Sequence, residues 1–371
     1  MSRDDEKRGA ITAAMPAATH RGGERGPNAA AAYAALDLGT NNCRLLVARP
    51  SRRGFKVSDA FSRIIRLGEG LGQTRRLSED AMQRTIEALS VCATKMERHN
   101  VARSRLVATE ACRSAENGAE FLARVNRDLG LGIEVLTHEM EARLAVCGCA
   151  SLIDSTSDLA LVFDIGGGSS ELIWLDLTRR HNVWRRSLED RLDAQNCIVG
   201  WTSLPVGVVT LAERFGKAFV DRPGFEQMVG HVLGLLEPFE TQHRFRQKIE
   251  RRTVHMLGTS GTVTTVAGVH LRLPRYDRGR VDGCWMNVTE VRTVVEALLG
   301  ASHEQRVAEP CIGRERADLV MAGCAILEAL LRMWPCERLR VAGRGLREGI
   351  LATLMAEDGV YRPGRRSRGG R

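Results

Sequence analysis

The stretch Tyr33–Arg49 reads YAALDLGTNNCRLLVAR, and its pattern decides the fold class. The apolar run Tyr33–Asp37 predicts a short buried strand, and Cys43–Arg49 predicts a second strand. Between them, Leu38–Asn42 is rich in glycine and asparagine. We therefore expect a β-hairpin whose tip is a loop of the size that holds a phosphate group.

The same pattern returns in the middle of the chain. Leu159–Asp164 predicts a strand, Ile165–Ser170 a glycine- and serine-rich turn, and Glu171–Leu177 another strand. A repeated unit of strand, aspartate, glycine loop and strand indicates two similar α/β domains that face each other across a cleft. The fold class expected from this repeat is α/β, with two actin-like domains.

The domain boundaries follow from the repeat and from composition. We expect a disordered extension over residues 1–30, a first actin-like domain over 31–145, a second over 146–361, and a disordered basic tail over 362–371. The tail carries five arginines and no acid, which leaves only about three of the nine net positive charges on the body of the chain. This mild charge predicts no specific binding of nucleic acid but allows an anionic substrate.

Composition also limits the cellular setting. The chain has 371 residues, of which 43% are apolar, and no apolar run approaches the roughly 18 residues that a membrane helix needs. The first thirty residues lack the apolar segment of a secretory signal. The ten cysteines include no CxxC pair, so we expect reduced thiols, no zinc site, no membrane association and a cytoplasmic location. A homodimer is left open.

Three glycine-containing loops follow predicted strands, and we expect them to bind phosphate. Glycine lets backbone N–H groups approach an anion, and flanking hydroxyl and amide groups add donors. A single loop of this kind is often only a turn, but three in one chain favour a phosphate site. The candidates are Gly39, Thr40, Asn41 and Asn42 in the first loop, Gly166, Gly167, Gly168, Ser169 and Ser170 in the second, and Ser260, Gly261 and Thr262 in the third.

Carboxylates accompany these loops and indicate a metal ion. Asp164 and Glu171 flank the second loop, and Asp37 precedes the first. A carboxylate beside a phosphate is repelled unless a hard cation such as Mg²⁺ lies between them. We therefore expect Asp164 and Glu171 to serve a site for Mg²⁺ or another divalent cation, with Asp37 as a third candidate. The simpler alternative is that each aspartate only caps its own turn.

Two further segments narrow the function. Ala108–Ala115 reads ATEACRSA, and Thr137–Leu144 reads THEMEARL. With DLGTNNCRLLVA, DIGGGSSEL, GTSGT and GLREGIL, they resemble the exopolyphosphatase and guanosine pentaphosphate phosphohydrolase family, from about Tyr33 to Leu354. The resemblance implies a substrate cleft between two acetate-kinase-like or actin-like domains. It implies that Glu141 activates the attacking water, that Arg113 contacts a phosphate, and that Asp164 and Glu171 belong to the metal and phosphate site.

The chain departs from the family pattern at two positions. Met140 stands where the family has a second acidic residue, and Gly343 stands where the loop before GLREG carries an acid. Because the resemblance ends near Leu354, we expect a short form of the family, without the additional helical C-terminal region of the longer members.

His138 is a weaker candidate for proton transfer. Two pairs of arginines, Arg63 with Arg66 and Arg314 with Arg316, could guide a polyanion at the cleft rim, although solvated surface charge is the simpler interpretation for each.

The sequence thus favours an exopolyphosphatase that removes terminal phosphate from inorganic polyphosphate. Guanosine pentaphosphate (pppGpp) is the alternative substrate for the same chemistry. An actin-like kinase or ATPase, or a non-catalytic binder of polyphosphate or nucleotides, is the alternative from another class.

Overall fold

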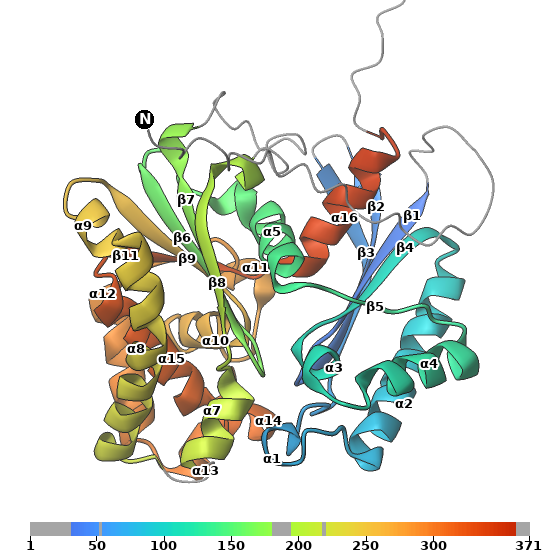
Figure 1. The fold of residues 1–371 in the computed structure, drawn as a ribbon, viewed down its shortest axis with the longest axis horizontal. Coiled ribbons are helices and arrows are strands. Elements are labelled where there is room, and N and C mark those ends of the chain that lie inside the picture. The colour runs from blue at the N-terminus through green and yellow to red at the C-terminus, as the bar shows by residue number, and fades with distance from the viewer. Residues whose placement is uncertain (1–30, 52–53, 180–193, 217–219, 361–371) are drawn as a thin grey trace, which may run out of the picture.

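Two β-sheets of related topology form the frame of the molecule (Figure 1). The computed structural model describes residues 31–51, 54–179, 194–216 and 220–360. The predicted extension over residues 1–30 and the predicted tail over 362–371 lie outside these described residues.

The first sheet has five strands in the order β3-β2-β1-β4-β5. It contains the predicted hairpin, since β1 and β2 pair antiparallel and the loop at their tip begins at Gly39. The strands β1 and β4 pair in parallel, as do β4 and β5. The bounds are Ala32–Leu38 for β1, Asn42–Ser51 for β2, Gly54–Ile64 for β3, Val101–Ala108 for β4 and Glu134–Val135 for β5.

The second sheet repeats this arrangement. Its six strands have the order β10-β11-β9-β6-β7-β8, so β8-β7-β6-β9-β11 has the order and directions of β3-β2-β1-β4-β5. Strand β10 is an addition at the edge. The repeat confirms the predicted α/β fold with two similar actin-like halves. The bounds are Leu159–Ile165 for β6, Ser170–Asp176 for β7, Ile198–Leu204 for β8, Val254–Thr259 for β9, Trp285–Asn287 for β10 and Arg338–Ala342 for β11.

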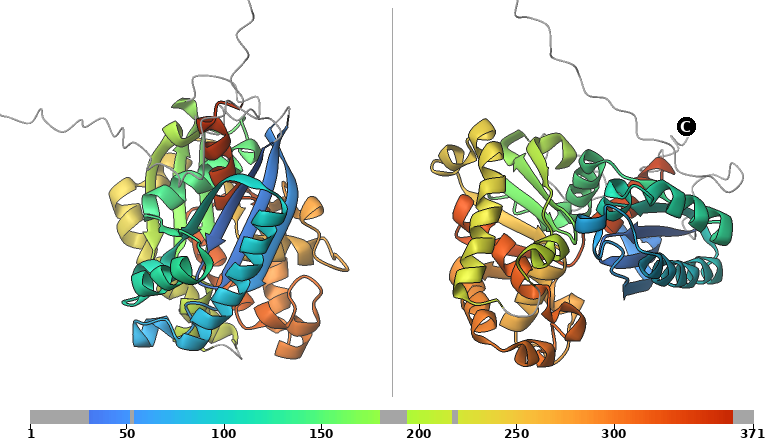
Figure 2. Two further views of the ribbon diagram at one scale, coloured as in Figure 1. Left: turned by 90° about the vertical axis from the view of Figure 1, so that its right-hand side faces the viewer. Right: turned by 60° about the horizontal axis from the view of Figure 1, so that its bottom comes forward.

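Helices cover both sheets (Figures 1 and 2). Those of the first half are α1 (Leu71–Thr74), α2 (Glu79–Arg98), α3 (Glu110–Ser114), α4 (Gly118–Leu129) and α5 (His138–Cys149). Those of the second half are α7 (Val208–Phe215), α8 (Arg222–His243), α9 (Phe245–Ile249), α10 (Gly261–His270), α11 (Arg278–Val281), α12 (Val288–Gly300), α13 (His303–Ala308), α14 (Arg314–Ala317), α15 (Val320–Met333) and α16 (Leu346–Glu357).

Strand β1 shows how the layers arise. Side chains alternate between the two faces of a strand. Leu36 and Leu38 accordingly enter the core shared with α2 and α4, whereas Tyr33 and Ala35 enter the core shared with α5 and α16. Strand β6 alternates in the same way, with Leu161 facing the helices α8, α10, α12 and α15. Each central strand is therefore buried on both faces, as its continuous apolar run predicts.

Helix α5 lies between the two sheets. Leu144 and Cys147 pack into the core of the first sheet, while Ala142 and Val146 pack into the core of the second. The last helix, α16, lies beside α5 and packs on the first sheet, although it follows the second sheet in the chain (Figures 1 and 2). Sequence order alone therefore does not separate the two cores, and the division of the chain at residues 145 and 146 stays a proposal.

Candidate active site

A cavity opens between the two sheets, where the loops that follow β1, β6 and β9 meet. It encloses about 970 Å³, including its open mouth. Its wall contains all but two of the predicted site residues. The predicted residues on the wall are Asp37, Gly39, Thr40, Asn41, Asn42, Glu141, Asp164, Gly166, Gly167, Gly168, Ser169, Glu171, Ser260, Gly261 and Thr262.

The first and second loops, which both line the cavity, are in direct contact with each other. A Cβ atom at Gly167 would lie 2.9 Å from Cβ of Thr40 and 3.2 Å from the backbone nitrogen of Asn41. A Cβ atom at Gly168 would lie 2.9 Å from Oγ1 of Thr40. The glycines are thus required for the close approach of the two halves, in addition to any contact with an anion.

The third loop carries backbone strain. Ser260 has a φ angle of 107°, which residues with a side chain rarely adopt. It directly precedes α10, and both Gly261 and Thr262, in the first turn of this helix, face the cavity. The N-terminus of a helix presents free N–H groups to an anion. A strained residue at this point is typical of a functional loop.

Glu141 lies in the first turn of α5 and projects into the same cavity. The helix begins there because Oγ1 of Thr137 accepts a hydrogen bond from the backbone N–H of Met140, at 3.2 Å. Burial raises the pKa of Glu141 well above its ordinary value, and the charge of Glu171 raises it further. A carboxylate with a raised pKa is a stronger base, which suits a residue that takes a proton from water.

Arg113 lies behind this carboxylate, outside the cavity wall. Its Nη1 donates to the carbonyl oxygen of Leu136 at 2.7 Å and lies 3.3 Å from Oε2 of Glu141. Its Nη2 and Nε both donate to Oε2 of Glu110, at 2.7 and 3.2 Å. Most donors of the guanidinium are therefore already used. The predicted contact between Arg113 and a phosphate stays a prediction, and the geometry favours a role in holding Glu141.

Buried carboxylates crowd the floor of the cavity. Burial raises the pKa of Asp164 to about 6, and burial together with the charge of Asp164 raises the pKa of Glu171 to about 7. Burial also raises the pKa of Asp37. Oδ1 of Asn41 is buried and has no hydrogen-bond partner among the described residues. Mutually repelling carboxylates beside an unused amide oxygen fit a hard divalent cation.

The group of side chains that could hold a metal ion differs in part from the predicted set. One atom from each of His138, Glu141 and Glu171 lies within 4.8 Å of the others. Within the described part of the chain this is the group whose ligand atoms are close enough to share an ion, and it includes Glu171 but neither Asp164 nor Asp37. The assignment of these two aspartates to the metal therefore stays a prediction.

The serines of the second loop differ from the prediction. The Ser170 hydroxyl is fully buried and donates to the carbonyl oxygen of Val206 at 2.7 Å, so it lies away from the cavity wall. The Ser169 hydroxyl donates to Oε1 of Glu171 at 2.7 Å. Both hydroxyls are engaged within the protein. In this loop the backbone N–H groups are the better candidates for holding a phosphate.

The two departures from the family pattern have structural counterparts. The Met140 side chain packs against the core that contains α16. An acid in its place would lose this apolar contact. Gly343 itself carries no acid, but a carboxylate from another segment lies beside it. Oδ1 of Asp282 accepts a hydrogen bond from the Gly343 N–H at 2.9 Å.

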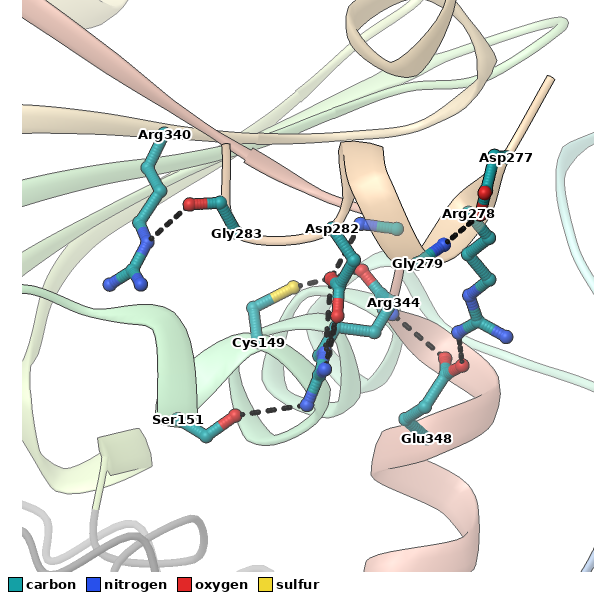
Figure 3. Close-up of polar contacts among 12 residues, drawn as sticks. Cys149, Ser151, Asp277, Arg278, Gly279, Asp282, Gly283, Arg340, Arg344 and Glu348 are labelled. Atoms are coloured by element: carbon teal, nitrogen blue, oxygen red, sulfur yellow. Dashed lines mark hydrogen bonds and ion pairs between the residues drawn. The ribbon is translucent and has the colours of Figure 1, made fainter. Parts of the chain in front are cut away.

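A second cavity adjoins the first. The residues that line both cavities are Asp37, Arg44, Asp164, Ser260, Gly261, Arg316 and Leu346. Beyond them, the second cavity is lined by the aromatic residues Phe61 and Tyr276 and by the arginines Arg278, Arg344 and Arg347. Figure 3 shows that Arg278 pairs with Glu348 and that Arg344 pairs with Asp282.

Sequence reasoning missed some residues of this region. Glu110 lines the first cavity and holds Arg113, and its only sequence signal is its place within ATEACRSA. Arg44 lines both cavities, and its alternation with the buried Cys43 and Leu45 could have placed it on the cleft face of β2. Arg316, for which solvated surface charge was the simpler interpretation, also lines both cavities.

The fold and the site define a class. The protein is a two-lobed, actin-like α/β protein whose central cavity combines three glycine-containing loops with a cluster of buried carboxylates. More narrowly, the chain belongs to the Ppx/GppA phosphatase family, whose sequence profile matches residues 46–358.

Individual relatives agree with this assignment. A protein named guanosine-5'-triphosphate,3'-diphosphate pyrophosphatase from Vibrio cholerae is 29% identical over 326 residues, and one of the same name from Photobacterium profundum is 28% identical. Each match covers 88% of this chain but 59% of the relative, so the chain spans about three fifths of the length of these relatives.

Solved structures share the fold. The crystal structure of the Aquifex aeolicus family member is 28% identical, with a TM-score of 0.68 over 88% of this chain and 98% of that one. An exopolyphosphatase from Cytophaga hutchinsonii is 22% identical, with a TM-score of 0.75 over 88% of this chain and 98% of that one. Among the described residues, no helix is long and apolar enough to cross a membrane.

Proposed function

We propose that the protein removes the terminal 5′ phosphate from guanosine 5′-triphosphate 3′-diphosphate, the nucleotide also called guanosine pentaphosphate. The observation that carries this proposal is the position of Glu141, whose carboxylate faces the same cavity as all three glycine-containing loops. The sequence alone favoured polyphosphate. The names of the relatives from Vibrio and Photobacterium favour the nucleotide, which was the alternative substrate.

The second cavity supports a nucleotide. A nucleoside needs an apolar or aromatic surface for its base, and Phe61 and Tyr276 offer one. A 3′-diphosphate needs cationic groups at a distance from the 5′ chain, and this cavity is lined by Arg347 and by Arg278, which also pairs with Glu348. A linear polyphosphate would need the cationic groups but not the aromatic ones.

The proposed reaction is hydrolysis of one phosphoanhydride bond. A water molecule held by Glu141 attacks the terminal phosphorus, and Glu141 takes one of its protons. The bond from that phosphorus to the bridging oxygen breaks, which releases inorganic phosphate and leaves guanosine 5′-diphosphate 3′-diphosphate. Burial of Glu141 and its neighbour Glu171 favours this proton transfer, because both raise the affinity of Glu141 for a proton.

Backbone groups would stabilise the transferred phosphate. The loops at Gly39–Asn42 and Gly166–Ser169 face each other, and the N-terminus of α10 closes the third side. N–H groups held rigidly around a phosphate stabilise the charge that develops in the transition state. A divalent cation bound near Glu171 would neutralise charge between the carboxylates and the phosphate oxygens.

The cysteines support a cytoplasmic location as part of this proposal. All ten are free thiols, and most of them are buried. Free thiols persist most readily in a reducing compartment.

The test is phosphate release by the purified protein with Mg²⁺ on four substrates. These are guanosine pentaphosphate, GTP, polyphosphate and ATP. GTP is the matched control, because it carries the same 5′-triphosphate without the 3′-diphosphate. We expect kcat/KM for guanosine pentaphosphate to exceed that for GTP by at least about tenfold, the value of one good ionic contact. Faster release of phosphate from polyphosphate than from either guanine nucleotide would instead identify the protein as an exopolyphosphatase. Turnover of ATP alone would favour the kinase or ATPase class.

A further inference from the structure

Two ion pairs connect α11 with the segment where α16 begins. Arg278 pairs with Glu348, and Asp282 pairs with Arg344 (Figure 3). Each segment carries its arginine first and its acid four residues later. Because the order of the charges is the same in both segments, the two pairs form together only when the segments run in opposite directions. The two pairs thus fix how these segments lie against each other.

Asp282 is the most connected member of this clamp of two ion pairs. Its Oδ1 and Oδ2 accept from Nε of Arg344 at 3.1 and 3.0 Å, and Oδ1 also accepts from the Gly343 N–H at 2.9 Å. Nη1 of Arg344 donates to Oγ of Ser151 at 3.2 Å, and its carbonyl oxygen accepts from the Cys149 thiol at 3.1 Å. One carboxylate therefore holds both the side chain of Arg344 and the backbone of the loop that contains it.

The acids of the clamp lie largely out of solvent. The side chain of Asp282 is 14% exposed and that of Glu348 is 5% exposed. Burial acts to lower the pKa of Arg344, but the hydrogen bond and the charge of Asp282 raise it above its ordinary value. Burial acts to raise the pKa of Glu348, but the charges of Arg347 and Arg278 lower it. Each pair therefore joins two full charges, and removal of one partner leaves an unpaired charge that is costly to bury.

The clamp joins the two halves of the molecule beside the second cavity. Val281 of α11 packs into the core of the second sheet, whereas Leu346 at the start of α16 packs into the core of the first. Tyr276 and Arg278 line the second cavity, and so does the loop from Gly343 to Leu346. The width of this cavity therefore depends on how the clamp holds α11 against the loop.

Asp282 itself lines neither cavity, so it can act on a bound molecule only through its partners. We infer that Asp282 is a positioning residue, which holds Arg344 and Gly343 and thereby fixes the wall of the second cavity for the part of the substrate remote from the terminal phosphate. The inference rests on the proposed function in one respect, that a substrate whose terminal phosphate lies in the first cavity extends into the second. Polyphosphate would extend in the same way, so either substrate can test it.

A second variant can move the carboxylate instead of removing it. A Cβ atom at Gly343 would lie 3.2 Å from Cβ of Asp282, and the backbone of Gly343 is not left-handed. An aspartate at position 343 would therefore place its carboxylate beside the present one, and a small shift would accommodate its Cβ. In Asp282→Ala/Gly343→Asp, the negative charge that faces Arg344 is thus supplied from the neighbouring segment.

The test is the steady-state kinetics of phosphate release by the whole chain with Mg²⁺. The variants are Asp282→Ala, Asp282→Asn, which keeps an acceptor for the Gly343 N–H, and the double variant. The matched control is Asp277→Ala at the other end of α11, where Oδ1 accepts from the Gly279 N–H at 2.8 Å and the residue lines neither cavity. Inhibition by orthophosphate, which can fill only the terminal position, is measured on each protein. Thermal melting checks that each variant is folded.

We expect Asp282→Ala to raise KM for the preferred substrate by about tenfold, the value of one ionic hydrogen bond, and to change kcat by less than about twofold. The double variant should recover most of the lost affinity, because the charge is restored. KM of Asp277→Ala and the inhibition constant of orthophosphate should stay at the values of the parent protein.

An unchanged KM in both single variants at position 282 would overturn the inference. An equal rise of KM in Asp277→Ala would also overturn it, since any weakening of α11 would then suffice. A folded double variant whose KM is no lower than that of Asp282→Ala would overturn it as well, because the charge facing Arg344 would then not matter. If Asp282→Ala does not fold, Asp282→Asn and the double variant give the answer. KM is compared on whichever substrate the protein hydrolyses fastest, so failure of the proposed nucleotide substrate leaves this result readable.

Discussion

At the scale of single residues, the site depends on one guanidinium that holds two carboxylates. Arg113 is nearly buried between Glu110 and Glu141, with its closest ion pair to Glu110 at 2.7 Å. The charge of Arg113 lowers the pKa of Glu141 against the larger effect of burial. By holding Arg113, Glu110 can therefore modulate the pKa of Glu141, although burial has the larger effect.

We expect Glu110→Gln to weaken turnover and to shift its pH dependence. The variant removes one negative charge and frees Arg113 to move toward Glu141, and both effects lower the pKa of Glu141. In the proposed reaction Glu141 acts in its ionised form, so activity should rise as pH increases through its pKa. In the variant this rise should occur at lower pH, and the maximal kcat should fall by about tenfold because the base is weaker and less well placed.

The pH dependence of kcat, measured in parallel on Glu116→Gln, distinguishes this role from a structural one. Glu116 is a half-exposed residue that pairs with Arg75 outside both cavities. If kcat of Glu110→Gln rose with pH over the same range as kcat of the parent protein, Glu110 would not act on Glu141 through Arg113.

The sequence predicted which residues form the three glycine-containing loops, but not the role of each residue. Glycine loops after strands can be recognised because the residues that form each one are neighbours in the chain. Glu110 and Arg44 become site residues only when β1, β2 and β4 align, and this depends on pairing between distant segments. The use of the Ser169 and Ser170 hydroxyls within the protein likewise depends on partners that the local sequence does not reveal.

At the scale of elements, α5 and α16 cross in unusually close contact. A Cβ atom at Gly148 would lie 1.9 Å from the carbonyl oxygen of Gly345, and one at Gly349 would lie 1.9 Å from that of Leu144. The two helices therefore meet backbone to backbone. Because α5 carries Glu141 in its first turn, this crossing helps to fix the position of Glu141 in the cleft.

Gly349→Ala should destabilise the protein by about 1–3 kcal/mol, because the added methyl group forces the helices apart. The matched control is Gly230→Ala in α8, where the added Cβ meets no atom within 4 Å. That variant should gain about 0.5–1 kcal/mol from the better helix propensity of alanine. Urea unfolding of both proteins measures the difference. Equal stability of the two variants would mean that the helices can separate at little cost.

The second hairpin is the element that should govern metal dependence. Asp164 and Glu171 are cross-strand partners, and both carboxylates, the first partly buried and the second buried, lie on the cavity wall. Asp164→Asn and Glu171→Gln keep the size of each side chain but remove its charge, so each should raise the Mg²⁺ concentration needed for half-maximal activity. Asp176→Asn, at the far end of β7, is the control. Metal titration curves that coincide with the parent in both cavity variants would remove these residues from the metal site.

Some elements were predictable and others were not. The paired hairpins follow from local patterns, and the structure confirms them. Strand β3 was not predicted, because it is a largely exposed edge strand without a continuous apolar run. The return of α16 to the first sheet could not be predicted, since an apolar helix does not indicate which of two sheets it will cover.

At the scale of the whole molecule, the cleft combines contributions from both lobes. The first lobe supplies the first loop and Arg44, the second supplies two loops and Arg316, and α5 supplies Glu141 from the layer between the sheets. The two cavities adjoin at Arg44 and Arg316, and together they lead from the glycine-containing loops to an aromatic and cationic region. This arrangement suits a substrate with several phosphates and a bulky remainder.

The central claim is that this cleft hydrolyses a phosphoanhydride with Glu141 as the base, and the most direct test is phosphate release by Glu141→Gln. The substitution keeps the shape of the side chain but removes its ability to accept a proton. We expect phosphate release from the best substrate to fall by at least about a hundredfold. The same preparation should bind imidotriphosphate, a triphosphate with non-hydrolysable bridges, as tightly as the parent protein or slightly more tightly, because a negative charge near the anion has been removed. Turnover close to that of the parent protein would contradict the claim and would remove Glu141 from the reaction.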